Sequence, residues 1–341
     1  MHARESYRHH RERRPGDHRT VRHPEEACVL DRWRIWVVVL GILGTITAPP
    51  SGAAAAGQAT TGGSPSAGTD GYAHPEMLAE APWLLDHVAD QRLRIVALTS
   101  AEEFAAAHIP GAGQIDWPAL EVTDTSDASI ARWHEQVAGQ LAGLGITPDQ
   151  TVVVYDNGTL WATRLWWVLH EVGHRDVRVL NGGLAAWQAA GGEVETGPPA
   201  LTAGTPPSDP YPIEPHPDAL AQLTEVAAQL GKPAAAIVDA RTSQEYAEGH
   251  IPGAVNLNYP LNALPDAPKR WKPATVLREM YAALGVNPDQ LVIPYCTTGV
   301  RSAVTFFTLR LIGYDHVALY TGSWKEWGAR PDTPKTTGFA P

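Results

Sequence analysis

The sequence is nearly free of cysteine. Among 341 residues it contains only Cys28 and Cys296. Processing of the N-terminal region would remove Cys28, and a single remaining cysteine cannot form an internal disulfide. Cys296 is therefore expected to be either an inert buried side chain or a working thiol.

Basic residues are also scarce outside the N-terminus. Residues 1–34 hold nine of the 26 basic residues and six of the 37 acidic ones, which leaves 17 basic against 31 acidic in the remainder. Such an acidic body argues against a nucleic acid as partner, because binding to phosphates needs lysine and arginine. The length and the apolar content of 44% are sufficient for two globular domains.

The apolar run at residues 35–48 is shorter than the ~20 residues of a bilayer span. Arg32 and Arg34 precede it and small residues follow it, which is the layout of a secretory signal. We predict a signal peptide or anchor over residues 32–56 and an exported, periplasmic or otherwise extracytoplasmic protein, which contacts a membrane only if this segment is uncleaved. Residues 1–31 are predicted to be a disordered basic extension; the alternative is a nucleic-acid-binding or metal-binding arm.

Strand-like and helix-like segments alternate along the rest of the chain. Strands are predicted at residues 94–98, 151–155 and 177–180, with helical patterns between them. This alternation predicts an α/β fold in which helices cover both faces of a parallel sheet. The predicted organisation is a linker at 57–74, a first domain at 75–196, a Pro-rich linker at 197–218, a second domain at 219–331 and a tail at 332–341.

The two domains are copies of one pattern. The motif HIPGA occurs at 108–112 and again at 250–254. The segment GITPDQTVVVYD at 145–156 returns as GVNPDQLVIPYC at 285–296, an offset of 140 residues. Self-similarity of this kind indicates a tandem duplication.

The copies differ at two chemically important positions. Asp156 stands where the second copy has Cys296, and Trp161 stands where it has Arg301. The first copy therefore lacks both the nucleophile and the cation, and we predict that it is inactive and helps to close a cleft between the domains.

Cys296 lies between a β-rich apolar run and a predicted buried helix. A strand, a tight loop and a helix N-terminus in this order direct backbone amides and the positive helix end at an anion. This arrangement favours the thiolate over the thiol, and it needs neither a metal nor a cofactor. Around Cys296, the predicted active-site loop comprises Thr297, Thr298, Gly299, Val300, Arg301 and Ser302.

These motifs together resemble the tandem-domain rhodaneses, a family of sulfurtransferases. The resemblance spans roughly residues 75–331 and includes WLLDHVAD, both HIPGA elements, IVDAR, the Cys296 loop and GSWKEWG. It implies two rhodanese-like domains, of which the second is catalytic. It also implies that Cys296 carries a sulfane sulfur as a persulfide, taken from thiosulfate or 3-mercaptopyruvate and passed to cyanide or a thiol. Thr297 and Thr298 are neutral, whereas thiosulfate-preferring relatives often carry basic residues directly after the cysteine. The CxxGxRS loop is nevertheless similar to that of thiosulfate-using bacterial relatives, which favours thiosulfate as the donor.

Several further residues are candidates for the site. Arg301 would either orient an anionic donor or form an ion pair that locks the fold. The resemblance implies that Arg241 contacts substrate or braces the loop; the alternative is an ion pair with Asp239 or Glu245. Asp239 is expected to fix loop backbone, and His250 to close a turn. Trp271 and Trp324 are expected to line the mouth of the cleft.

Two other functions compete with sulfur transfer. A cysteine phosphatase or arsenate reductase also uses a thiolate in an anion-binding loop, but there the arginine follows the cysteine by six positions, and Arg301 follows Cys296 by five. A non-catalytic rhodanese-like module that binds or senses a ligand is the other alternative.

Overall fold

The computed structural model describes residues 71–198 and 209–341. The predicted basic extension, the signal peptide or anchor, Cys28 and most of the first predicted linker lie outside these residues, as do residues 199–208 of the second predicted linker. Among the helices of the described chain, none is both long and apolar enough to span a bilayer.

The N-terminal domain is built around a five-stranded sheet. The strands run parallel in the order β1-β5-β4-β2-β3. Its elements are η1 (Pro75–Met77), β1 (Leu78–Ala79), α1 (Ala81–His87), β2 (Leu93–Leu98), α2 (Ala101–Ala106), β3 (Gly113–Ile115), η2 (Trp117–Leu120), α3 (Asp127–Gly143), β4 (Thr151–Tyr155), α4 (Ala162–Glu171), β5 (Asp176–Leu180) and α5 (Gly183–Ala189).

The C-terminal domain repeats this plan around a shorter sheet. Three parallel strands lie in the order β7-β6-β8. Its elements are α6 (Leu223–Gln229), β6 (Ala235–Asp239), α7 (Ser243–Glu248), β7 (Val255–Asn256), η3 (Tyr259–Asn262), α8 (Ala274–Ala283), β8 (Leu291–Tyr295), α9 (Val300–Leu311) and α10 (Ser323–Trp327).

Isolated bridges complete the second sheet. Val292 of β8 forms a parallel bridge with Val317, and Leu319 forms one with Leu220. These bridges take the places that β5 and β1 hold in the first domain, so the strand order is the same in both. The predicted fold of two α/β domains, each a parallel sheet flanked by helices, is confirmed.

Alternating side chains on the central strands bury both faces of each sheet. In β4, Val152 and Val154 enter one core, while Val153 and Tyr155 enter another with α1, α2 and α5. The first core continues without interruption into the C-terminal domain, where it includes α8 and α9. The two domains therefore share a large apolar core.

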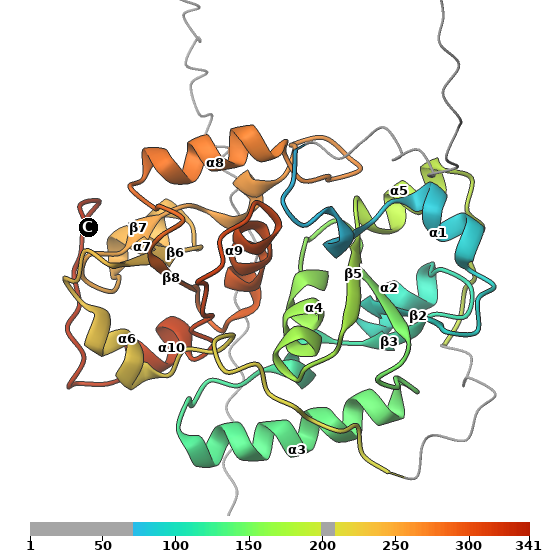
Figure 1. Ribbon diagram of the computed structural model, residues 1–341, viewed down its shortest axis with the longest axis horizontal. Helices are drawn as coiled ribbons and strands as arrows, with labels where there is room; N and C mark the ends of the chain where they lie inside the picture. Colours follow the sequence, from blue (N-terminus) through green and yellow to red (C-terminus); the bar gives the residue numbers. More distant parts are fainter. Residues whose placement is uncertain (1–70, 199–208) are drawn as a thin grey trace, which may run out of the picture. The chain divides into compact units, whose positions relative to one another are not determined.

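Helices α4 and α9 form the centre of this shared core and lie side by side in Figure 1. Trp166 of α4 and Phe306 of α9 occupy equivalent positions of the repeat, and their ring centroids are 6.4 Å apart. Trp166 also meets Phe307 edge to face at 4.9 Å. Packing of equivalent helices against each other places the loop before α9 next to the N-terminal domain.

Candidate active site

Cys296 directly follows β8 and its side chain is almost fully buried, with 1% exposure. The backbone amide of Gly299 donates a hydrogen bond to Cys296 Sγ at 3.2 Å. Gly299 adopts φ = 87° as the N-cap of α9, a conformation that glycine enters at little cost. The loop thus turns an amide and the start of a 12-residue helix toward the sulfur.

The segment before and within α10 fixes the loop from behind. Cys296 N donates to Ser323 Oγ at 3.1 Å, and Cys296 O accepts from Trp324 N at 3.0 Å. Thr297 O accepts from Lys325 N, also at 3.0 Å. Ser323 adopts φ = 54°, which is unusual for a residue other than glycine. These bonds hold the loop backbone in one conformation before any substrate arrives.

Arg301 is held by Glu245 of α7. Its Nη1 and Nη2 atoms donate to the two Glu245 carboxylate oxygens at 2.9 and 2.7 Å, and Nη2 also donates to Thr297 Oγ1 at 2.6 Å. The bond from Arg301 lowers the pKa of Glu245 to about 2. Burial acts to lower the pKa of Arg301, but Glu245 and the nearby Cys296 outweigh it and leave that pKa raised. The guanidinium is therefore charged and positioned at the loop.

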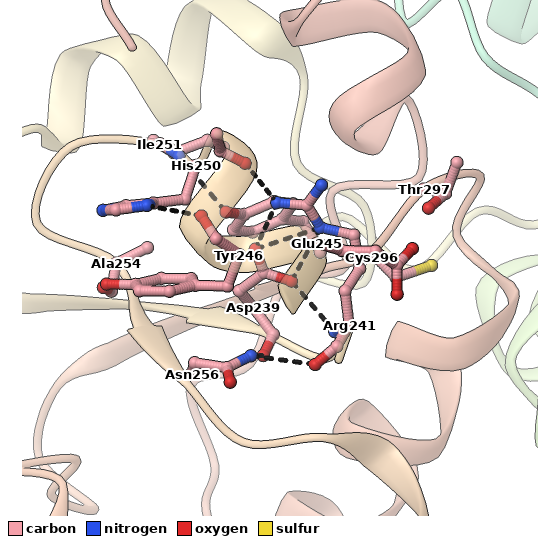
Figure 2. A network of polar contacts seen from close by, with 12 residues as sticks. Asp239, Arg241, Glu245, Tyr246, His250, Ile251, Ala254, Asn256, Cys296 and Thr297 are labelled. Atoms are coloured by element: carbon pink, nitrogen blue, oxygen red, sulfur yellow. Dashed lines mark hydrogen bonds and ion pairs between the residues drawn. The ribbon is translucent and has the colours of Figure 1, made fainter. Parts of the chain in front are cut away.

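Arg241 and Asp239 form a second, deeper ion pair. Arg241 Nη2 donates to Asp239 Oδ2 and to Gly249 O, each at 2.6 Å, and Arg241 N donates to Asp239 Oδ1. Arg241 is 3% exposed and Asp239 is fully buried. Figure 2 shows this pair at the centre of a polar network with Cys296 at its edge. The placement fits bracing of the β6–α7 connection, and Arg241 is absent from the pocket that Cys296 lines.

His250 lies within the same network, away from the pocket. Its Nδ1 lies 2.9 Å from Tyr246 O, and its ring stacks on Tyr246 with 3.7 Å between centroids. His108 lies in the same way on Phe104, at 3.8 Å, in the N-terminal domain. A histidine that makes the same contact in both copies stabilises the turn of the HIPGA motif.

A pocket of about 690 Å³ opens onto the loop. Its walls come from both domains, since Trp117 and Trp161 belong to the first and Tyr259 and Pro260 to the second. Its lining includes four residues of the predicted active-site loop besides Cys296, namely Thr297, Thr298, Val300 and Arg301. Gly299 and Ser302 lie beneath the lining, where the Ser302 side chain is fully buried in the first turn of α9.

The equivalent loop of the N-terminal domain is filled by its own carboxylate. Asp156 Oδ1 accepts from the amides of Gly158 and Thr159 at 2.7 and 2.9 Å, and Oδ2 accepts from Ala162 N at 2.7 Å. Burial nevertheless raises the pKa of Asp156 above its usual value. The amides that could hold a substrate anion are thus occupied.

Trp271 does not line the cleft mouth, which corrects the expectation from sequence. It is 2% exposed, and its Nε1 donates to Thr308 Oγ1 within the shared core. Trp324 is half-buried and its ring lies 4.8 Å from the Arg241 guanidinium. The tryptophans that line the pocket are instead Trp117 and Trp161. In the sequence, Trp161 stood out only because it occupies the position at which the second copy has Arg301.

A duplicated α/β domain with a buried thiol at the carboxyl end of a central strand defines a class of thiol-dependent enzymes. The sequence model of the rhodanese-like domain matches residues 80–190 and 222–330. The chain belongs to the rhodanese-like family and contains the domain twice.

Relatives that this chain covers almost over their full length support this assignment. The chain is 34% identical over 292 residues to sulfur carrier protein TtuD of Thermus thermophilus, covering 79% of this chain and 99% of the relative. It is 33% identical over 274 residues to thiosulfate sulfurtransferase of Azotobacter vinelandii, covering 78% and 98%. The crystal structure of SseA from Escherichia coli, described as a 3-mercaptopyruvate sulfotransferase with the rhodanese fold, is 29% identical with a TM-score of 0.63, covering 73% and 98%.

Proposed function

We propose that the protein is a sulfurtransferase that moves sulfane sulfur from thiosulfate or 3-mercaptopyruvate to cyanide or a thiol through a persulfide on Cys296. The observation that carries the proposal is the Gly299 amide, which points at Cys296 Sγ from 3.2 Å at the floor of a pocket. Relatives named thiosulfate sulfurtransferase and 3-mercaptopyruvate sulfurtransferase, each covered almost over its full length, support this reaction class.

The reaction is two displacements at one sulfur. The Cys296 thiolate attacks the outer sulfur of thiosulfate, an S–S bond forms, and the original S–S bond breaks to release sulfite. Cyanide then attacks the outer sulfur of the persulfide and leaves as thiocyanate, which restores the thiolate. With 3-mercaptopyruvate the C–S bond breaks instead, the thiol proton moves to carbon and pyruvate leaves. The two half-reactions predict ping-pong kinetics.

The loop stabilises the anion in both half-reactions. The charge alternates between Sγ of the thiolate and the outer sulfur of the persulfide, so amide donors and the helix end at fixed positions suit it. Arg301 adds positive charge at the rim, although Glu245 and Thr297 take up hydrogen bonds from both of its terminal nitrogens. Its role is to order the loop and to offset negative charge, with no proton transfer.

The Arg301 contacts disfavour the phosphatase or arsenate reductase alternative. A phosphate needs a guanidinium free to bind two oxygens at once. Glu245 occupies that bidentate face of Arg301. The shorter spacing between Cys296 and Arg301 also leaves fewer amides for an oxyanion with several oxygens.

Turnover with both donors tests the proposal. Purified protein should form thiocyanate from cyanide with thiosulfate or with 3-mercaptopyruvate, and Cys296→Ser should abolish turnover with either. Absence of turnover with both donors would leave the non-catalytic binding module as the better account. Full turnover by the Cys296→Ser protein would refute the site. The ratio of kcat/KM values for the two donors identifies the preferred one.

We also propose that the protein is exported and that residues 32–56 serve as a signal peptide or, if uncleaved, as a membrane anchor through residues 35–48. The support is the order of Arg32 and Arg34, a short apolar run and small residues. Determination of the mature N-terminus tests this. A start near residue 57 in an extracytoplasmic fraction agrees with cleavage, whereas Met1 in cytoplasmic extract refutes export.

A further inference from the structure

The N-terminal domain contributes an unpaired buried cation to the region behind the Cys296 loop. Arg164 lies in α4 and has 0% exposure. Its Nη2 donates to Leu120 O at 2.6 Å, while Nε and Nη1 have no hydrogen-bond partner among the described residues. The guanidinium lies 4.6 Å from the centre of the Trp167 ring, which cannot accept both remaining donors.

Arg164 Nη1 faces the active-site loop of the other domain. A Cβ placed on Gly299 would lie 3.2 Å from this nitrogen. Gly299 is the residue whose amide donates to Cys296 Sγ. The packing of α4 against α9 produces this approach, and Figure 1 shows the two helices side by side. The free nitrogen of Arg164 and the catalytic sulfur are thus close to the same glycine.

The carboxylates whose charges act on Arg164, Glu121 and Glu171, have other partners. Glu121 accepts from Lys325 Nζ at 3.1 Å, and Glu171 lies 2.9 Å from His134 Nε2. Burial lowers the pKa of Arg164 to about 10, and among the opposing influences Cys296 is the largest, ahead of Glu121 and Glu171. Arg164 therefore remains a cation at neutral pH, and within residues 71–198 and 209–341 no carboxylate forms an ion pair with it.

A buried cation without a counterion is costly, because desolvation is not offset by an opposite charge. Each half of the proposed reaction places a negative charge on Cys296. We propose that Arg164 is the internal counterion of the Cys296 thiolate and persulfide, so that the non-catalytic domain supplies part of the electrostatics of the active site. This inference deepens the proposed function and makes Arg164 a positioning residue, which acts across the loop without touching substrate.

The charged groups around Cys296 give this role its specificity. Arg301 lines the pocket and is neutralised by Glu245, while Arg164 is fully buried and has no ion-pair partner among the residues that the structure describes. A cation that is paired and partly solvated stabilises a nearby thiolate less than a desolvated, unpaired cation does. Loss of Arg164 should therefore reduce the thiolate population of Cys296, even though Arg164 does not line the pocket.

The test is the pH dependence of Cys296 alkylation by iodoacetamide in the full chain, followed at the Cys296 peptide by mass spectrometry. Arg164→Met should move the midpoint upward by about one pH unit or more, a tenfold loss of thiolate at a given pH below it. The control is Arg178→Met, which removes a cation over Trp83 in the same domain, at 4.7 Å from that ring. The control midpoint should not move.

Two further variants separate charge from packing. Arg164→Lys keeps the charge and should hold the midpoint within about half a unit of wild type. If Arg164→Met does not fold, Arg164→Gln is measured instead, since it loses the charge and keeps an amide donor. An unchanged midpoint in the neutral variant, or an equal shift in Arg164→Lys, overturns the proposal.

Thermal unfolding of sulfur-loaded protein separates this inference from the proposed function. Treatment with thiosulfate should raise the Tm of wild type and raise that of Arg164→Met less. Failure of thiosulfate to load the wild type would count against sulfur transfer, while the alkylation midpoints would still decide the role of Arg164. An equal rise of Tm in both proteins would contradict the counterion role.

Discussion

Arg301 and Glu245 form a two-bond ion pair across the edge of the active-site pocket, with N–O distances of 2.9 and 2.7 Å. The pair joins the loop that carries Cys296 to α7. Glu245 has a second role there, because it forms a capping box with Thr242 at the start of that helix. One carboxylate therefore fixes both a helix end and the position of the loop cation.

Glu245→Gln should reduce stability in a pH-dependent way. The pKa of Glu245 is lowered to about 2, so its contribution to stability is present above pH ~4.5 and is lost as the pH falls toward 2. Because the side chain is 34% exposed, we expect only about 1 kcal/mol at pH 7 after solvent screening. Urea unfolding between pH 2 and 7 measures this. An equal loss for the variant at pH 2 and pH 7 would contradict the ion-pair account.

Gly299→Ala should disrupt the loop. The position has φ = 87°, and an added Cβ would lie 2.8 Å from Thr321 Oγ1 and 3.0 Å from Thr321 O. We expect a loss of about 2–4 kcal/mol in unfolding free energy, from left-handed strain and overpacking together, and slower alkylation of Cys296.

The matched control for this change is Gly285→Ala. Gly285 has a similar φ of 76°, but no atom of the described part of the chain lies within 4 Å of an added Cβ. It should cost only the conformational strain, about 1–2 kcal/mol, and leave Cys296 alkylation unchanged. Equal effects of the two substitutions would mean that the contact with Thr321 is unimportant.

Asp156→Ala should destabilise the N-terminal domain without removing the reactive thiol. The substitution leaves three backbone amides of the loop without their acceptor. We expect a loss of about 2–3 kcal/mol, measured by urea unfolding. Asp149→Ala is the control, because Asp149 is exposed and should cost under about 0.5 kcal/mol. If the two variants lose similar amounts of unfolding free energy, the Asp156 carboxylate does not stabilise the loop.

Trp161→Ala should expose the persulfide to solvent thiols. Trp161 lines the pocket and packs edge to face against Trp117 with ring centroids 6.3 Å apart. Removal of this wall should speed the loss of bound sulfur to dithiothreitol several-fold, measured by mass spectrometry of sulfur-loaded protein. Trp83→Ala, a substitution of a tryptophan stacked on His87 away from the pocket, should not change this rate. No difference between the variants would exclude a shielding role for Trp161.

Much of the fold follows from local sequence. The strand predicted at residues 151–155 has these bounds in the structure, because β-branched residues alternate into two cores. The sequence repeat at an offset of 140 residues also predicted the second sheet. Helix α3 was not predicted. Its packed face, which includes Trp133 and Leu141, is identified only by the burial of these residues in the structure.

The site was only partly accessible from sequence. The position of Cys296 after a strand was readable because strand, loop and helix are consecutive in the chain. Arg164 was not, because it meets the loop through packing of α4 on α9, and the repeat pairs it with Val304. The one available signal was a lone arginine within the apolar run ATRLWWVL. Trp271 was misplaced because composition does not tell a core tryptophan from one that lines a cleft.

Intact-protein mass spectrometry after incubation with thiosulfate tests the central claim most directly. The account predicts a gain of about 32 Da, one sulfur atom, located at Cys296 and removed by cyanide as thiocyanate. Cys296→Ser should show no gain. A wild-type protein whose mass stays unchanged with both thiosulfate and 3-mercaptopyruvate, or a gain that persists in Cys296→Ser, would contradict the account.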